Sequence, residues 1–288
     1  MKVLVTGANG QLGQALAASV PADADLTALD RAALDIGDGD AVAAAIDAIA
    51  PDLVVNAAAY TAVDKAESDA EAAWRVNAAG PGHLAAAAAG VRARFIQVST
   101  DFVFDGASGI PYRPDQPTAP LGVYGASKRA GEEAVLAAHP DALIVRTAWV
   151  YGTSGHNFVR TMLRLMAERD ELRVVADQIG TPTYATGLAH ALWALDAAGA
   201  QGIHHWTDSG AASWYDFAVA IQEEALALGL LARAVPVVPI ATGDYPTPAR
   251  RPSYSILDKA SAVALVGAPA PHWRVHLRDM LGVIKAHG

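Results

Sequence analysis

Short apolar runs alternate with longer segments of helical composition along the first half of the chain. Between the runs, segments suited to helices lie at about 11–20, 39–49, 66–90 and 124–138. Alternating strands and helices are typical of a parallel sheet with helices on both faces. The pattern therefore predicts a doubly wound α/β fold with a first domain over residues 1–150. The expected strands are the apolar runs at 3–5, 26–29, 53–55, 95–98 and 143–145.

The second half of the chain, after Gly152, has a less regular pattern. We expect residues 151–288 to form mainly a smaller, discontinuous substrate-binding lobe, with some segments returning to the first domain. Such a lobe would lie against the carboxyl edge of the sheet, where ligands of open α/β folds bind. The pattern predicts helices near 156–168, 184–198, 213–228 and 273–286, and short strands near 172–175 and 235–238.

A glycine-rich turn follows the first apolar run directly. Gly7, Gly10 and Gly13 are each separated by two residues, and a helical segment comes next. Glycines let the backbone approach a pyrophosphate closely, and the start of the following helix attracts negative charge. The next strand ends at Asp30, where a carboxylate would meet a ribose hydroxyl. These features predict a Rossmann-type dinucleotide-binding domain, and a flavodoxin-like turn without nucleotide is the alternative, because GxxGxxG differs from the usual spacing.

The composition narrows the class of protein. The 288 residues carry a formal net charge of −9, which argues against nucleic acid or an anionic membrane as partner. There is no cysteine, so disulfides and thiolate catalysis are excluded. No apolar run is long enough to span a bilayer, and polar residues from Thr6 onward interrupt any signal-peptide core. We therefore expect a cytoplasmic protein.

Tyr124 and Lys128 are the candidates for acid–base chemistry. They lie four residues apart in a predicted helix, so they share one face and the ammonium can ease ionisation of the phenol. Thr100 ends the strand of the preceding unit and can orient a carbonyl oxygen. Taken alone, the pair could be a chance feature of a solvated face, and Ser99-Thr100-Asp101 could be a helix-capping turn.

Several motifs together resemble the extended short-chain dehydrogenases/reductases. These are GxxGxxG, Asn56-Ala-Ala-Ala59, Ser99-Thr100-Asp101 and YxxxK, in this order. More narrowly, nearly the whole chain resembles the dTDP-4-dehydrorhamnose reductase family. That similarity rests on Ala59-Tyr-Thr-Ala-Val-Asp64-Lys-Ala-Glu67, Ser99-Thr-Asp-Phe-Val-Phe104, Arg146-Thr-Ala-Trp149-Val-Tyr151, Asp177-Gln-Ile-Gly180-Thr-Pro-Thr183 and Tyr245-Pro-Thr-Pro-Ala249-Arg-Arg-Pro252.

The resemblance implies NADH or NADPH as cofactor and assigns residues to it. Asp30 would meet the adenosine ribose, and Tyr124 and Lys128 the nicotinamide ribose. The turn residues Gly7, Gly10, Gln11, Leu12 and Gly13 would form the pyrophosphate site, Asp35 and Ile36 would lie at the adenine, and Ala59, Tyr60 and Thr61 along the nicotinamide half.

The substrate implied by the resemblance is dTDP-4-dehydro-L-rhamnose, reduced at its C4 keto group to give dTDP-L-rhamnose. Thr100 and Asp101 would meet the sugar, with Thr100, Tyr124 and Lys128 as the catalytic set. Val63 and Trp149 would shape the sugar pocket, although Trp149 could instead be a core residue. Our own hypothesis adds Arg251 as a clamp on the nucleotide phosphates, with a plain surface arginine as the alternative.

Other functions stay open at this point. The chain could reduce or epimerise another nucleotide 4-keto-6-deoxy sugar, or be a non-catalytic, dinucleotide-binding regulatory subunit. Intact Thr100, Tyr124 and Lys128 argue against the regulatory subunit. The Asp-Glu pair of related dehydratases is missing after Thr100, and the Cys/His pair of epimerising reductases is impossible without cysteine.

The chain departs from the family pattern in two places. Phe102 stands where some relatives have tyrosine, which would remove a polar contact beside the sugar. Some members dimerise through magnesium held by C-terminal glutamates, but no glutamate follows Glu224. A homodimer fits the resemblance, whereas a magnesium bridge is not expected. We expect no metal site, and we interpret His272 and His276 as surface or packing residues.

Overall fold

The computed structural model describes residues 1–287, and its central feature is a six-stranded parallel sheet. The strands lie in the order β10-β5-β4-β3-β1-β2, and each neighbouring pair is parallel. The predicted doubly wound parallel sheet is thereby confirmed. The strands are β1 (Lys2–Thr6), β2 (Asp25–Leu29), β3 (Leu53–Asn56), β4 (Arg94–Thr100), β5 (Leu143–Thr147) and β10 (Gly202–His205).

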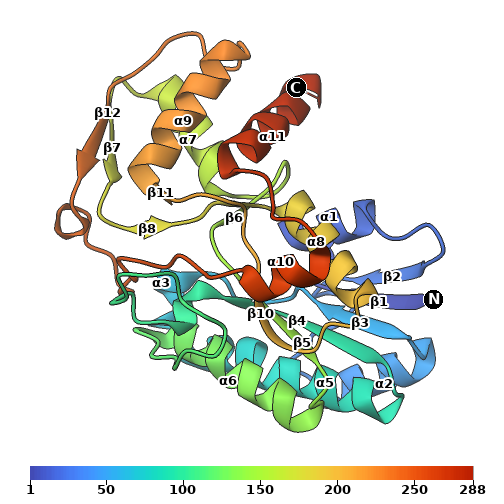
Figure 1. Ribbon diagram of the computed structural model, residues 1–288. Helices are drawn as coiled ribbons and strands as arrows, with labels where there is room; N and C mark the ends of the chain where they lie inside the picture. Colours follow the sequence, from blue (N-terminus) through green and yellow to red (C-terminus); the bar gives the residue numbers. More distant parts are fainter. Residues whose placement is uncertain (288) are drawn as a thin grey trace.

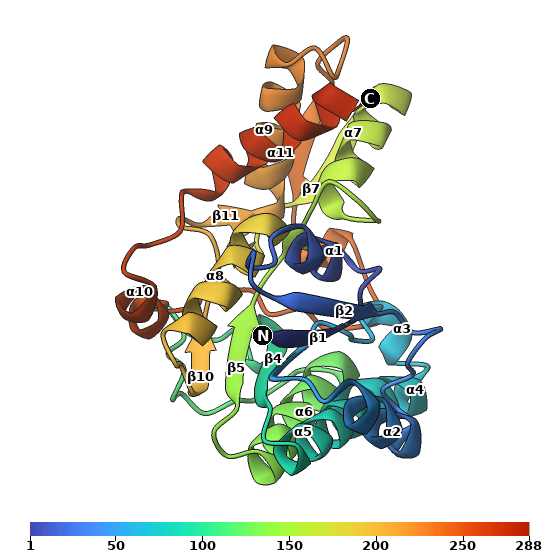
Figure 2. The same ribbon diagram turned by 90° about the vertical axis from the view of Figure 1, so that its right-hand side faces the viewer.

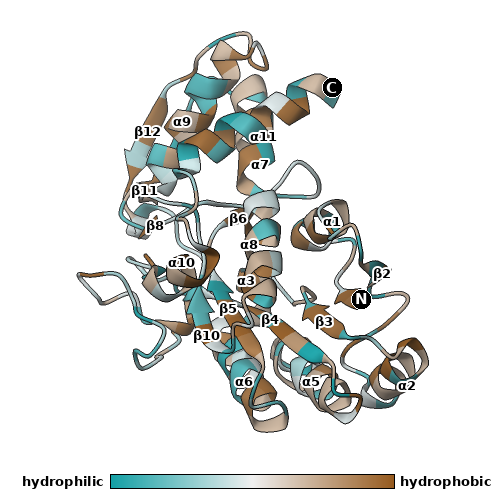
Figure 3. Ribbon diagram, turned by 45° about the vertical axis from the view of Figure 1, so that its right-hand side comes forward, coloured by the Kyte–Doolittle hydropathy of each residue, from teal (hydrophilic) through white to brown (hydrophobic). Residues whose placement is uncertain are grey.

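Helices cover both faces of this sheet (Figures 1 and 2). Successive side chains of a strand point to opposite faces, so both faces need apolar cover. Val3 and Val5 enter one core with α1 and α8, while Leu4 enters another core with α2 and α5. Strands β3 and β4 are accordingly mostly hydrophobic in Figure 3. The first face carries α1 (Gln11–Ala18), α8 (Ala185–Ala197) and α10 (Ala260–Val266), and the second carries α2 (Gly39–Ile49), α5 (Gly80–Gly90) and α6 (Val123–Ala138).

The helix expected over 66–90 is present from residue 70 to residue 90, but it is not regular. It consists of α4 (Ala70–Trp74), a π-helical turn (Arg75–Ala79) and α5, which follow without a break, and a separate short helix α3 (Val63–Ala66) precedes it. Pro81 has no N–H to donate, so the regular helical bonding cannot pass through it. The wider turn places Asn77 so that its side chain accepts a hydrogen bond from Tyr60 N at 2.8 Å and donates one to Tyr60 O at 3.0 Å. The irregularity therefore fixes the loop after β3.

A second group of elements packs around its own hydrophobic core, at the top of Figure 1. Its strands form three small two-stranded sheets, β6 with β9, β7 with β12 and β8 with β11. The division of the chain at residue 150 stays a prediction. The elements are β6 (Val150–Tyr151), α7 (Phe158–Glu168), β7 (Leu172–Val175), β8 (Ile179–Gly180), β9 (Thr183–Tyr184), β11 (Ala212–Ser213), α9 (Trp214–Ala227), β12 (Val237–Ile240) and α11 (Trp273–His287).

Segments from the second half also complete the main sheet. The pattern did not predict β10, which pairs with β5 and forms one edge, nor α10, which packs against α8. The strand expected near 235–238 lies at 237–240. Within residues 1–287, no helix combines the length and apolar character needed to cross a membrane.

A buried ion pair joins α6 to β5 beneath the carboxyl edge of the sheet. Arg146 donates from Nε to Glu132 Oε1 at 2.9 Å and from Nη2 to Glu132 Oε2 at 2.7 Å. Both side chains are less than a twentieth exposed, at 3% and 4%. The guanidinium carbon also lies 5.1 Å from the centre of the Phe104 ring. Bidentate geometry of this kind offsets much of the cost of removing two charges from water.

We predict that Glu132→Gln lowers the free energy of unfolding by about 3–5 kcal/mol, because it leaves the Arg146 charge buried without compensation. Urea denaturation of the purified chain measures this. The control is Glu133→Gln, which removes the neighbouring exposed carboxylate that pairs with Arg129 and should cost less than about 0.5 kcal/mol. Equal losses in the two variants would contradict the assigned role of the buried pair.

Candidate active site

One large cleft, with a volume of about 880 Å³, lies at the carboxyl ends of the main strands. The structure gathers there all of the site residues expected from the sequence except Gly13. Their roles stay predictions, but their proximity is a feature of the fold. The residues are Gly7, Gly10, Gln11, Leu12, Asp30, Asp35, Ile36, Ala59, Tyr60, Thr61, Val63, Thr100, Asp101, Tyr124, Lys128, Trp149 and Arg251.

The glycine turn joins β1 to α1 and leaves no room for side chains. Gly7 has a φ of +76°, in the left-handed region, and a Cβ there would lie 2.6 Å from Ala58 N. A Cβ on Gly13 would overlap the Gly7 carbonyl. Gly13 therefore lets α1 pack closely against the turn. The turn exposes backbone to the cleft where a side chain would otherwise stand.

Two carboxylates at the far end of the cleft are held in place by the chain itself. Asp30 Oδ1 accepts from the N–H groups of Ala32 and Ala33, each at 3.0 Å, and its Oδ2 accepts from Asn9 Nδ2 at 2.6 Å. Asp35 accepts from Arg75 Nη1 at 2.9 Å. Burial acts to raise the pKa of Asp35, but the Gly37 N–H and the Arg75 guanidinium outweigh it and lower that pKa.

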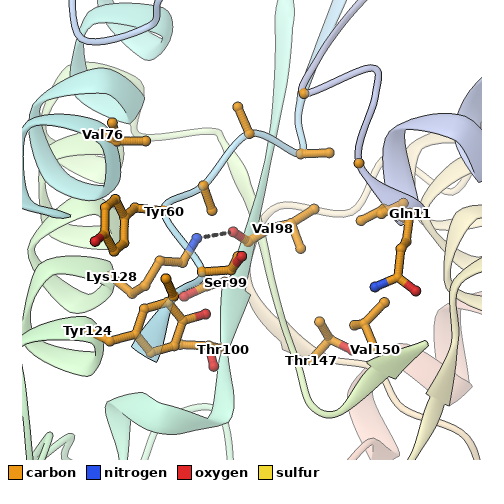
Figure 4. A pocket seen from close by; sticks show the side chains of 18 of the residues that line it. Gln11, Tyr60, Val76, Val98, Ser99, Thr100, Tyr124, Lys128, Thr147 and Val150 are labelled. Carbon is orange, nitrogen blue, oxygen red and sulfur yellow. Dashed lines mark hydrogen bonds between the residues drawn. The ribbon is translucent and has the colours of Figure 1, made fainter. Parts of the chain in front are cut away.

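The catalytic candidates lie together on one side of the cleft (Figure 4). Tyr124 and Lys128 lie one turn apart on α6, and Thr100 ends β4. Lys128 is 4% exposed, and its Nζ donates to Val98 O at 2.8 Å. The Tyr124 ring meets the edge of Phe102, with ring centres 5.4 Å apart at 76°. The α6 helix thus presents phenol and ammonium to the same space.

Burial controls the protonation of these groups. It raises the pKa of Tyr124 to about 12, with the Asp101 charge adding to the rise and the Thr100 hydrogen bond opposing it. It lowers the pKa of Lys128 to about 8, although the Glu132 carboxylate opposes the shift. It also raises the pKa of Asp101 to about 6, although the nearby Ser255 and Thr100 hydroxyls oppose the rise. At neutral pH the phenol keeps its proton, so Tyr124 is suited to act as an acid.

Three buried polar atoms in the wall of the cleft have no hydrogen-bond partner. They are Ser99 Oγ, Asp101 Oδ2 and Thr147 Oγ1. Buried polar groups are nearly always paired, so unpaired atoms at a cavity point to a polar ligand. Sequence reasoning did not assign a role to Ser99 or Thr147. The sequence did hold one indication, because Ser99 and Thr147 stand at the ends of two apolar strands. These strands, β4 and β5, are neighbours in the sheet, and their register places Thr147 beside Thr100.

A stacked pair of indoles forms the opposite wall. The rings of Trp149 and Trp214 lie 3.5 Å apart and within 6° of parallel, and both line the cleft. The backbone of Trp149 has a φ of +47°, which is unusual for a bulky residue. A Cβ on Gly180 would lie 2.7 Å from the Trp149 ring, so glycine is required beneath it. Sequence reasoning missed Trp214, because no local pattern links the start of α9 to a residue after β5.

Arg251 reaches the cleft but already has an acidic partner. Its Nη2 donates to Asp64 Oδ2 at 2.7 Å and its Nη1 to Asp64 Oδ1 at 3.1 Å. That guanidinium lowers the pKa of Asp64. Val63 begins α3 beside this pair. Arg251 thus ties the 245–252 segment to α3, and a phosphate would share its charge with Asp64.

A chain of buried hydrogen bonds runs under the cleft from strand to strand. Thr6 Oγ1 donates to Asn56 Oδ1 at 2.7 Å, and Asn56 Nδ2 donates to Gln97 Oε1 at 2.8 Å. Gln97 Nε2 then donates at 2.8 Å to Val98 O, which also accepts from Lys128. This chain fixes β1, β3 and β4 relative to one another where they meet the ligand space.

The described residues 1–287 contain no cluster of three or more His, Cys, Asp or Glu side chains placed to hold a metal ion. His276 instead lies 2.9 Å from Asp208, atom Nδ1 to Oδ1.

Comparison with known proteins finds relatives that match nearly the whole chain. The family model described as the RmlD substrate binding domain matches residues 1–285. A dTDP-4-dehydrorhamnose reductase of Burkholderia thailandensis is 46% identical over 98% of this chain and 99% of its own length. The crystal structure of a dTDP-4-dehydrorhamnose reductase from Clostridium acetobutylicum has a TM-score of 0.94 at 40% identity, covering 99% of this chain and 100% of that one.

A further solved structure of the same kind was determined with a dinucleotide. The dTDP-4-dehydrorhamnose reductase of Bacillus anthracis, in complex with NADP, has a TM-score of 0.93 at 38% identity and covers 98% of this chain and 99% of that one. The family model and these relatives all span nearly the full length. The chain belongs to the RmlD family of dTDP-4-dehydrorhamnose reductases.

Proposed function

We propose that this chain reduces the C4 keto group of dTDP-4-dehydro-L-rhamnose with NADH or NADPH, giving dTDP-L-rhamnose. The observation that carries the proposal is the meeting of Thr100, Tyr124 and Lys128 in one cleft with the glycine turn. Full-length relatives at 40% identity or more are named for this activity. The unpaired atoms of Ser99 and Thr147 supply polar contacts that a dinucleotide or a sugar would satisfy.

The residues present fit a nicotinamide dinucleotide. The side-chain-free surface at Gly7 and Gly10, at the start of α1, suits a pyrophosphate, and Asp30 lies at the rim for the adenosine ribose. Asp35 and Ile36 would hold the adenine, while Tyr60 and Lys128 would flank the nicotinamide ribose. Arg31 also lines the cleft beside Asp30, which supports use of NADPH as well as NADH. The bound cofactor supplies the hydride, and the chain supplies orientation and the proton.

The protein contributes three linked actions to the reduction. Thr100 Oγ1 donates a hydrogen bond to the substrate carbonyl oxygen in place of its 3.0 Å bond to Asp101. Tyr124 Oη delivers its proton to the same oxygen as negative charge develops there. The Lys128 ammonium stabilises the phenolate that remains, and the phenol regains a proton from solvent. Each action favours the transition state over the bound ketone.

The sugar would lie between Asp101 and the Trp149 indole. Asp101 Oδ2 has no partner within the chain and can accept from a sugar hydroxyl. Trp149 and Val63 would provide apolar walls, and Arg251 would meet a phosphate while keeping its contact with Asp64. A wrong epimer would leave these polar groups unpaired, at a cost of about 1–3 kcal/mol each.

Partners and location are part of the same proposal. The net charge of −9 supports an enzyme that binds neither nucleic acid nor membrane and acts in the cytoplasm. A homodimer without a magnesium bridge stays a prediction, supported by the absence of glutamate after Glu224 in the sequence.

The central test is product identification by NMR after incubation with reduced cofactor and a panel of nucleotide 4-keto-6-deoxy sugars. We expect dTDP-4-dehydro-L-rhamnose to be reduced fastest and dTDP-L-rhamnose to be formed. Much faster reduction of another sugar would show that the narrow assignment is wrong. Tight binding of NADPH without reduction of any sugar would favour a regulatory subunit.

Tyr124→Phe should lower kcat by roughly 10²–10⁴-fold, because the variant lacks the positioned proton donor. Its affinity for NADPH, measured by fluorescence titration, should stay within a factor of about 3 because the glycine turn is untouched. Tyr215→Phe is the control, since it removes a hydroxyl away from the cleft. Near-normal turnover by the Tyr124 variant would exclude the phenol as proton donor.

The pH dependence of reduction should report the Lys128 charge. Burial lowers the Lys128 pKa to about 8, so the ammonium is present below that pH and lost above it. We expect initial-rate kcat/KM to fall by about tenfold per pH unit above the Lys128 pKa. The Lys128→Arg variant stays positively charged over the same pH range. We expect it to be less active than the wild type, with a kcat/KM that does not fall as the pH rises. If kcat/KM falls equally in the arginine variant, the pH dependence comes from a group other than Lys128.

A further inference from the structure

A single buried amide connects the glycine turn with the second group of elements. Asn157 is the N-cap of α7, and its Oδ1 accepts from Arg160 N at 3.0 Å. Its Nδ2 donates to Gly152 O and to Gln11 Oε1, each at 2.8 Å. The residue is 8% exposed. The same side chain therefore begins α7, fixes the preceding loop and holds the first residue of α1.

The loop that Asn157 fixes lies against the glycine turn. Gly155 and His156 line the cleft together with Gln11. Gly155 has a φ of +70°, and a Cβ there would lie 3.4 Å from Gln11 Cγ. The loop and the turn are therefore near neighbours at this point, and the Asn157 hydrogen bond to Gln11 is the direct link between them.

An unbroken series of contacts leads from Asn157 to the opposite wall. Phe158, the next residue, packs on Trp214 with ring centres 4.7 Å apart. Trp214 in turn stacks on Trp149 at 3.5 Å. The series joins the residue that holds Gln11 to the indoles that wall the proposed sugar pocket. Coupling between sites requires such a contiguous element that both ligands bias.

We propose that Asn157 is a positioning residue that couples the two halves of the cleft, so that a dinucleotide at the glycine turn and a dTDP-sugar whose sugar lies at the indole wall bind cooperatively. This inference rests on the proposed function, because that function names the two ligands. A dinucleotide that orders Gln11 also orders the 152–156 loop and α7 through Asn157. The second ligand then binds a wall that is already ordered, which increases its affinity.

The test uses NADPH and dTDP-L-rhamnose, which fill both halves of the cleft without turnover because both are already reduced. Calorimetry gives the Kd of dTDP-L-rhamnose for the full chain with and without saturating NADPH. We expect NADPH to tighten dTDP-L-rhamnose binding by roughly 5-fold or more. In Asn157→Ser the serine still caps α7 but is too short to reach Gln11, so the ratio of the two Kd values should fall to about 1.

Two further variants separate coupling from a general loss of stability. Gln11→Met removes the acceptor from the other side and leaves the α7 cap intact, so it should also abolish the coupling, and the double variant should add nothing. Thr161→Val removes a hydrogen bond to Asn157 O on the same helical turn but spares the Gln11 contact. It should keep the wild-type ratio.

The outcomes are distinct. Equal Kd values for dTDP-L-rhamnose with and without NADPH in the wild type, or full coupling retained in Gln11→Met, would overturn the inference. Should Asn157→Ser fail to fold, the Gln11→Met result decides alone. A chain that binds neither NADPH nor dTDP-L-rhamnose would instead contradict the proposed function. Normal reduction of the sugar without any coupling would refute only the role of Asn157.

Discussion

The buried hydrogen bonds between Thr6, Asn56 and Gln97 are the constraint on which the cleft depends. These hydrogen bonds lie at the ends of three parallel strands. They therefore fix the point at which each strand ends and the backbone turns toward the cleft. Thr6 immediately precedes the glycine turn, and Gln97 bonds the carbonyl that also holds Lys128. The glycine turn and the Lys128 ammonium are thus attached to one rigid edge. Polar side chains are tolerated in this core because each finds a partner.

Low solvent access is the second determinant of the chemistry. An ammonium as buried as that of Lys128 would tend to lose its proton, and a buried phenol tends to keep one. The Glu132 carboxylate lies one turn beyond Lys128 on the same helix and favours the charged form. Arg146 holds Glu132 with both of its oxygens engaged. The buried ion pair and the charge state of Lys128 are therefore parts of one arrangement.

The sequence predicted those parts of the fold that depend on residues close together along the chain. Apolar β-branched runs gave five strands of the main sheet, and the turn at Gly7 and the spacing of Tyr124 and Lys128 identified the cleft. The pattern did not reveal β10, because Gly202-Ile-His-His205 has little strand character and gains its place by pairing with β5. Trp214 and the Asp64 partner of Arg251 were also missed. Both contacts join residues far apart in sequence, and only the packed structure brings them together.

The left-handed backbone of Trp149 has a consequence for how this protein can change. A bulky residue at a φ of +47° costs about 1–3 kcal/mol of backbone strain, which its stacking against Trp214 must offset. Glycine at this position would relieve the strain but would remove the indole wall. Glycine would also lose the stacking that offsets the strain, so the two effects of the change on stability oppose each other. The indole keeps its place at position 149 because its stacking on Trp214 holds a backbone conformation that the residue would not adopt alone.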